Sequence, residues 1–142
     1  MFLNKIDAQS ELTQNYVDAV LNNDWKTAYK IIQSLIKEGN ATAEHTMGWF
    51  HEQGIEVPQS DKEAFNWWLK SAPKGVVESQ AALGLLYLSG KGTDTNYEKA
   101  YYWLSLAVKN GETYVATEAL QAKEKLTLWQ YLYIKLLLLL KL

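Results

Sequence analysis

The stretch SDKEAFNWWLKSAPKG, residues 60–75, recurs as NYEKAYYWLSLAVKNG at residues 96–111, and a looser copy, DWKTAYKIIQSLIKEG, occupies residues 24–39. Each copy starts 36 residues after the one before it. A polar residue opens every copy, an alanine stands near its start and a glycine closes it. Self-similarity at a fixed step of this length indicates a repeat protein, in which each copy is one structural unit.

Each repeated position has a physical role that predicts a helix. Residues such as asparagine, aspartate and serine are good N-caps, because their side chains accept hydrogen bonds from the free amides of the first turn. Glycine suits the position after a helix, because it adopts a left-handed conformation without a Cβ clash. Alanine allows a neighbouring helix to approach closely, and the residue three positions later is expected to anchor the core. In the three copies the caps are Asp24, Ser60 and Asn96, the glycines are Gly39, Gly75 and Gly111, the alanines are Ala28, Ala64 and Ala100, and the anchors are Ile31, Trp67 and Trp103.

Aromatic residues gather around the anchors Trp67 and Trp103. Core packing is favoured over a ligand-stacking role, because both tryptophans keep the register of the repeat. Their neighbours Trp68 and Tyr102 are expected to be half exposed.

A second helix is predicted before each of the two clear copies, at residues 41–53 and 77–89. Each of these helices contains a glycine, Gly48 or Gly84, at the same step of 36. A glycine inside a helix costs roughly 1 kcal/mol relative to alanine. Such a cost is tolerated where another helix packs closely, so these glycines are expected to face the partner helix of the unit.

The expected fold class is therefore all-α, an alpha-alpha superhelix (solenoid) of helix-turn-helix units in a single domain, 1–142. The repeats are placed at 40–75 and 76–111, between an N-terminal capping unit at 5–39 and C-terminal capping helices at 112–142. Stacked units are expected to share a continuous core that no unit could bury alone.

Small and aromatic residues alternate in a pattern shared by both units: Ala43, Met47, Gly48, Gly54, Ala64, Trp67, Ala72 and Gly75 in the first, and Leu83, Gly84, Tyr87, Gly90, Gly92, Ala100, Trp103, Ala107 and Gly111 in the second. Over residues 42–111 this pattern resembles the Sel-one-like repeat, a member of the tetratricopeptide-like helical repeats. The resemblance implies an adaptor that binds a partner protein, on a concave surface lined by the first helix of each unit.

Helical geometry identifies the side chains that would line this surface. Residues of the first helix that lie opposite Gly48 project away from the rest of the unit, and the equivalent places in the next unit include Ala81. Tryptophan and tyrosine are common interface anchors, although Trp49 could instead be part of the core. The candidate partner-binding residues are Tyr16, Thr42, His45, Trp49, Glu52, Glu78, Leu85, Leu88, Tyr114 and Gln121.

Composition excludes several classes of function. A net charge of -2 lacks the positive surface that nucleic-acid binding requires. Cysteine is absent, which excludes disulfides and thiolate zinc sites. His45 and His51 stand six residues apart on one predicted helix and point to different faces, so no metal site and no cofactor are expected. The first residues lack the long apolar segment of a secretory signal, so the expected compartment is the cytoplasm.

The leucine run at residues 136–140 is the least ordinary part of the sequence. A membrane span is not expected, because the apolar stretch from residue 126 is shorter than the ~20 residues that a membrane helix needs. A terminal helix that packs on the core or against a second chain is predicted instead. Formation of a homo-oligomer through this leucine-rich helix is therefore one alternative.

Catalysis has little support in the sequence. There is no cysteine nucleophile, no Gly-x-Ser-x-Gly elbow and no complete phosphate loop. We therefore expect a non-enzymatic scaffold or adaptor for a partner protein. One alternative is a bacterial immunity or antitoxin protein that neutralises a cognate toxin. Another is a ligand-binding or hydrolytic protein of the kind that Sel-one-like repeats associated with β-lactams form, although those are typically rich in paired cysteines.

Overall fold

Eight α-helices and two short 3-10 helices form the described part of the chain, and no β-strand occurs in it. The structure is a computed structural model that describes the backbone of residues 2–140 and the side chains of residues 10–140. Residues 1 and 141–142, at the ends of the predicted domain, lie outside the described residues. The elements are α1 (Phe2–Leu21), α2 (Trp25–Lys37), α3 (Ala41–Gln53), α4 (Asp61–Ser71), η1 (Ala72–Lys74), α5 (Val77–Ser89), α6 (Tyr97–Lys109), η2 (Thr113–Val115), α7 (Ala116–Glu124) and α8 (Leu128–Leu140).

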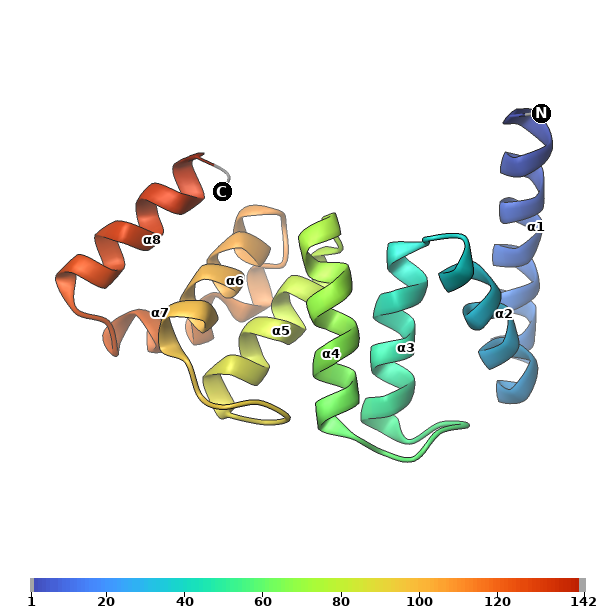
Figure 1. Cartoon of the computed structure of the whole chain (residues 1–142), viewed down its shortest axis with the longest axis horizontal. Helices are drawn as coiled ribbons and strands as arrows, with labels where there is room; N and C mark the ends of the chain where they lie inside the picture. Colours follow the sequence, from blue (N-terminus) through green and yellow to red (C-terminus); the bar gives the residue numbers. More distant parts are fainter. Residues whose placement is uncertain (1, 141–142) are drawn as a thin grey trace.

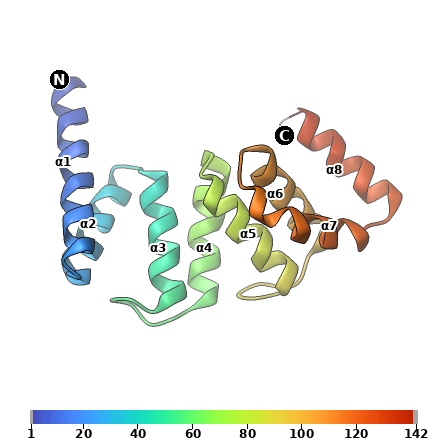
Figure 2. The same cartoon turned by 180° about the vertical axis from the view of Figure 1, so that it is seen from behind.

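The helices stack in a row, with the two ends of the chain at opposite ends of the row (Figure 1). The view from behind shows the same order (Figure 2). Helices pack in the pairs α1–α2, α3–α4 and α5–α6, and contacts of α2 with α3 and of α4 with α5 join these pairs. The predicted all-α solenoid is confirmed.

Side-chain caps set the starts of the repeated helices. Asp24, Ser60 and Asn96 each accept a hydrogen bond from the backbone amide three residues later, at 3.1, 3.2 and 2.9 Å. Asn40 caps α3 in the same way, accepting from the amide of Ala43 at 2.9 Å. Removing such a cap typically costs about 1 kcal/mol. The starts and ends predicted for the helices at residues 41–53 and 77–89 are those of α3 and α5.

Close helix packing explains the glycines inside α3 and α5. A Cβ on Gly48 would lie 2.4 Å from the indole nitrogen of Trp68, and a Cβ on Gly84 would lie 2.6 Å from Cγ of Leu104. Ala64 and Ala100, which are fully buried, allow the same approach from the other helix of each pair. The expectation that both glycines face the partner helix is confirmed.

The predicted core anchors of α4 and α6 are wrong by one residue. Trp67 and Trp103 are half-buried, whereas Trp68 is buried and Leu104, its equivalent 36 residues later, is fully buried. The reason is that the glycines of α3 and α5 face Trp68 and Leu104, so these side chains enter the space between the paired helices. Ile31, the anchor of α2, is buried as expected.

The core consists of two hydrophobic clusters instead of the expected continuous one. The first joins α1, α2 and α3 and includes Ile32 and Phe50. The second joins α4 to α8 and includes Trp68, Leu104 and Ile134. Buried polar side chains of α3, α4 and α5 lie at the junction between the two clusters.

The loop between α5 and α6 contacts the preceding helix pair. Gly92 has a left-handed φ of +72°, and a Cβ there would lie 2.3 Å from the backbone oxygen of Asp61, the first residue of α4. Glu56, at the equivalent place 36 residues earlier, has the same backbone handedness with φ 59°. The two loops therefore share left-handed backbone at this position, although only the second loop has a glycine there.

The last helix, α8, turns back onto α6. Ile134 is buried at this contact, and the rings of Tyr131 and Tyr101 lie 5.8 Å apart. Much of the rest of α8 is exposed, including Trp129 and Leu139. Among the described helices, none combines the length and the apolar character that crossing a membrane would require.

Candidate functional site

Six of the ten candidate partner-binding residues surround one hollow on the surface, here called the central hollow. Its volume is about 250 Å³. The side chains come from α3, α4, α5 and η2, so elements of three successive parts of the stack form its walls. The lining residues are His45, Trp49, Glu52, Trp68, Glu78, Ala82, Leu85, Leu86 and Tyr114.

The geometry of α3 explains why its polar and aromatic side chains reach this hollow. Met47, Gly48 and Phe50 are buried against other helices. His45, Trp49 and Glu52 recur at steps of three or four residues, which places them on one face of the helix. Helix α3 therefore supplies one wall of the central hollow.

Trp49 belongs partly to the core as well. Its ring lies 6.0 Å from that of Trp25 and 5.7 Å from that of Phe50. The sequence left open whether Trp49 is a surface anchor or part of the core. In the structure it is both, because it packs against the first cluster and also lines the central hollow.

The other four candidate residues do not line the central hollow. Tyr16 is half-buried against the first cluster, and Leu88 is half-buried against the second. Thr42 and Gln121 are exposed elsewhere. Ala81, which was expected to project outward from α5, is fully buried, because α5 packs against α4, α6 and α7 together.

The sequence analysis missed three lining residues, Trp68, Ala82 and Leu86, of which Trp68 is the largest. Its indole Nε1 donates a hydrogen bond of 3.1 Å to the backbone oxygen of His45, and the two rings are stacked with centroids 6.1 Å apart. The facing glycine, Gly48, leaves room for one large ring, but in the sequence it does not say whether Trp67 or Trp68 fills this space. Trp68 thus joins the core to the floor of the central hollow.

His45 links the central hollow to the buried polar junction. Its Nδ1 lies 2.7 Å from the hydroxyl oxygen of Ser79, which in turn is hydrogen-bonded to the hydroxyl of Ser71. Burial lowers the pKa of His45 below its ordinary value of 6.5, and the carboxylates of Glu78 and Glu52 partly oppose this shift. His45 is therefore mostly uncharged at neutral pH.

The free energy of unfolding should accordingly fall as the pH drops below about 6.5. In the unfolded chain His45 takes up a proton near that pH, whereas in the folded chain its lowered pKa delays the uptake. Between the pKa of His45 in the folded chain and its higher pKa in the unfolded chain, a falling pH therefore favours unfolding. Above the unfolded-state pKa, His45 adds no pH dependence to the free energy of unfolding. Urea denaturation at about pH 7.5 and about pH 5.5 measures the fall.

The control for this prediction is the other histidine. His45→Gln should lose part of the fall, while His51→Gln, on the same helix, should keep it. An equal fall in the His45→Gln variant and in the unsubstituted chain would contradict the assignment.

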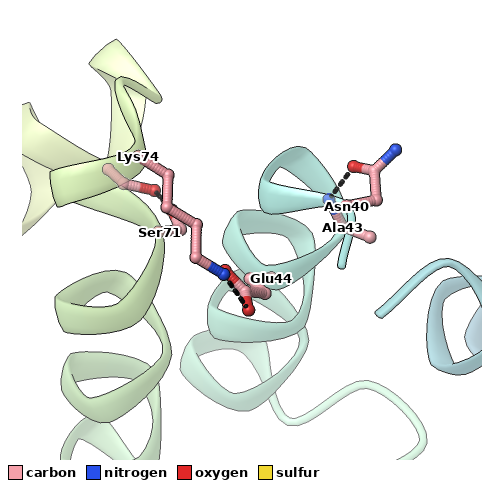
Figure 3. Close-up of polar contacts among 6 residues, drawn as sticks. Asn40, Ala43, Glu44, Ser71 and Lys74 are labelled. Atoms are coloured by element: carbon pink, nitrogen blue, oxygen red, sulfur yellow. Dashed lines mark hydrogen bonds and ion pairs between the residues drawn. The ribbon is translucent and has the colours of Figure 1, made fainter. Parts of the chain in front are cut away.

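An ion pair at the same junction joins α3 to the end of the α4–η1 segment. The Nζ of Lys74 lies 2.6 Å from one carboxylate oxygen of Glu44 and 2.7 Å from the other, as Figure 3 shows beside the Asn40 cap. The Glu44 side chain is mostly buried, whereas that of Lys74 is 45% exposed. The pair satisfies a carboxylate that would otherwise be buried without a partner.

A larger hollow of about 520 Å³ lies beside α8, between η1, α5, α6 and α8. Tyr102, Trp103 and Leu138 contribute to its lining. Its single charged lining residue, Lys109, already donates a hydrogen bond to the backbone oxygen of Leu138. It is a gap beside the last helix, and the charged groups that could orient a partner lie at the central hollow instead.

Comparison with known proteins begins with the repeats themselves. Residues 41–76 and 77–112 each match the family model described as Sel1 repeat, which is the family that the sequence resembles. Together these matches cover half of the chain.

Two curated relatives share part of the sequence. A sel1-like repeat-containing protein, R850, of Acanthamoeba polyphaga mimivirus is 29% identical over 89 residues, which make up 63% of this chain and 17% of that protein. The chitin synthase regulator SKT5 of Saccharomyces cerevisiae is 40% identical over 52 residues, 37% of this chain and 8% of that protein. The chain thus spans a small fraction of the length of these relatives.

Two solved structures share the fold. A Sel1 repeat protein from Oxalobacter formigenes superposes with a TM-score of 0.63 at 29% identity, covering 66% of this chain and 27% of that one. The protective antigen c5321 of uropathogenic Escherichia coli superposes with a TM-score of 0.70 at 28% identity, covering 79% of this chain and 24% of that one.

Proposed function

This chain belongs to the Sel1 repeat family, whose repeats generally mediate protein–protein interaction, and we propose that it is a non-enzymatic scaffold that binds a partner protein at the central hollow. The observation that carries the proposal is the convergence of Trp49, Leu85 and Tyr114, from three separate parts of the stack, on one surface hollow. Large aromatic and aliphatic side chains around such a concavity are the usual anchors of a protein interface. Tyr114 is 66% exposed and is open to a partner.

The proposal gives the chain no catalytic step. His45 and Ser79 are paired in the way that a general base and a nucleophile are paired. However, Ser79 is fully buried and shares its hydroxyl with Ser71, so a substrate has no access to it. The pair therefore supports packing between α3 and α5.

Site-specific photo-crosslinking tests where a partner binds. A benzophenone amino acid at Tyr114 should capture one stoichiometric protein in native extract, because this side chain borders the central hollow. The same amino acid at Tyr133, an equally open tyrosine of α8 that is 60% exposed, is the matched control.

Substitution of the hollow itself should then abolish binding of the captured partner. Trp49→Ala with Leu85→Lys removes one anchor and places a positive charge on the apolar wall, and should weaken the affinity by about a hundredfold or more. The control Trp129→Ala with Leu132→Lys makes the same two kinds of change on α8 and should leave the affinity unchanged. Circular dichroism verifies that helical content is retained.

Because Trp49 also packs in the core, Tyr114→Ser serves as a second variant that leaves the core intact. Unchanged affinity in both hollow variants would refute the assignment.

Two narrower roles remain predictions: capture at Tyr114 addresses the first, and capture at the α8 position Tyr133 addresses the second. An immunity or antitoxin role requires that the captured partner is a toxin whose activity the chain suppresses. Self-association through α8 rests on its open apolar face, which includes Leu128, Leu136 and Leu139, and requires a second copy of the chain as the partner.

A further inference from the structure

The walls of the central hollow are aromatic, and its rim is acidic. Trp49, Trp68 and Tyr114 supply the rings, and Glu52 and Glu78 supply the charges. No lysine or arginine is among the described residues that line it. Since the imidazole of His45 is mostly uncharged at neutral pH, the hollow carries negative charge that its own walls do not balance.

Further carboxylates surround Tyr114. Burial raises the pKa of the Tyr114 hydroxyl, and the negative charges of Glu112, Glu78 and Glu118 raise it further. Within residues 10–140, none of these carboxylates nor that of Glu52 forms an ion pair. The carboxylates therefore add to one another on this side of the molecule.

Glu118 adds one more carboxylate whose charge acts on Tyr114. Its Oε2 is buried and has no hydrogen-bond partner among the described residues. Glu118 follows Tyr114 by four residues, at the start of α7. Glu118 does not line the central hollow, so its contribution there is its negative charge and not a contact.

The size of the central hollow indicates what kind of group fits. Its volume of about 250 Å³ is below the ~300–1,000 Å³ of pockets that enclose a whole small molecule. One long side chain that reaches in from a partner protein is the better match.

We infer that the central hollow receives an arginine side chain from a basic segment of the partner protein. The inference rests on the proposed function and names the chemistry of its partner. A guanidinium group stacks on the faces of aromatic rings, here Trp49 and Tyr114. Its N–H groups also donate in pairs to carboxylates, here Glu52 and Glu78. Arginine suits the site better than lysine, because the ammonium group is more strongly hydrated and does not stack.

Short peptides test this inference without knowledge of the partner. The probes are acetyl-Gly-Ala-Arg-Ala-Gly-amide and the same peptide with citrulline, which keeps the shape of arginine and lacks its charge. In the intact chain labelled with nitrogen-15, the indole N–H resonance of Trp49 should shift saturably with the arginine peptide. The citrulline peptide should bind about tenfold or more weakly. Added salt should reduce the difference, because it screens the partly exposed carboxylates.

Charge-removing variants supply the control. Glu52→Gln with Glu78→Gln should bring the affinity for the arginine peptide down to that for the citrulline peptide. Glu11→Gln with Glu124→Gln makes the same change in net charge away from the hollow and should leave the affinity unchanged.

The possible outcomes separate this inference from the proposed function. Equal shifts with both peptides, or no Trp49 shift at about 10 mM arginine peptide, would overturn the arginine inference. Stronger binding of the matching lysine peptide would overturn the choice of arginine. If the Trp49→Ala, Leu85→Lys variant still loses the captured partner in any of these cases, the scaffold function stands and its partner is not held by arginine.

Discussion

Replacing Trp68 by alanine should lower the free energy of unfolding by about 3–5 kcal/mol. The ring is 3% exposed and fills the space that Gly48 leaves between α3 and α4. The substitution also removes the donor to the backbone oxygen of His45 and the ring stacked on the His45 imidazole. Urea denaturation followed by circular dichroism measures the loss.

A second substitution makes this prediction specific to the contact. In the unsubstituted chain Gly48→Ala should destabilise, because its Cβ would lie 2.4 Å from the Trp68 ring. In the Trp68→Ala background the same change should stabilise by up to about 1 kcal/mol, since alanine favours a helix over glycine and the space is now free. An effect of the same sign in both backgrounds would show that the ring does not govern the choice of glycine.

Gly92→Ala should destabilise the chain by about 2–5 kcal/mol. Two costs add at this position. The left-handed backbone, with φ +72°, disfavours any residue with a Cβ, and the Cβ itself would meet the backbone oxygen of Asp61 at 2.3 Å. Backbone atoms cannot rotate away as a side chain can, so the loop or α4 must move.

The matched control for this prediction is Gly75→Ala. Gly75 is also left-handed, with φ +93°, but a Cβ there would meet nothing within 4 Å. It should therefore cost about 1–2 kcal/mol, the conformational part alone. If the two substitutions prove equally costly in urea denaturation, the contact between the loop and α4 adds nothing to stability.

The sequence was sufficient to predict the helix pairs, because local interactions determine where these helices begin. Asp24, Ser60 and Asn96 act through the three residues that follow them, so their effect could be foreseen without knowledge of the fold. The facing of Gly48 and Gly84 could also be foreseen, since a buried glycine in a helix implies a close neighbour.

The choice between Trp67 and Trp68 could not be foreseen from the repeat. A step of 36 residues identifies equivalent positions, but it does not say which of two adjacent side chains faces the partner helix. Contacts between helices decide this, and they select Trp68 because it stands opposite Gly48. The buried hydrogen bond between Ser71 and Ser79 escaped notice for the same reason, since it joins two helices.

The central hollow was foreseen in part. The six candidate residues that line it lie on α3, α5 and η2, where helical periodicity indicated the outward face. Tyr16 and Gln121 lie at the two ends of the stack, where the repeat gives no guide to orientation. No sequence pattern predicted the larger hollow beside α8, because α8 has no counterpart in the repeat.

Because the walls of the central hollow come from three successive parts of the row, its width depends on the angle at which these parts stack. In a solenoid each unit contacts only its neighbours, so a small change of angle between neighbouring units bends the whole row. Tension or twist applied to the ends would open or close the hollow. Because such coupling is reciprocal, a bound partner would resist bending of the row by the same coupling free energy. A partner bound at the central hollow, as proposed, would therefore change its affinity when a force acts on the distant ends of the row.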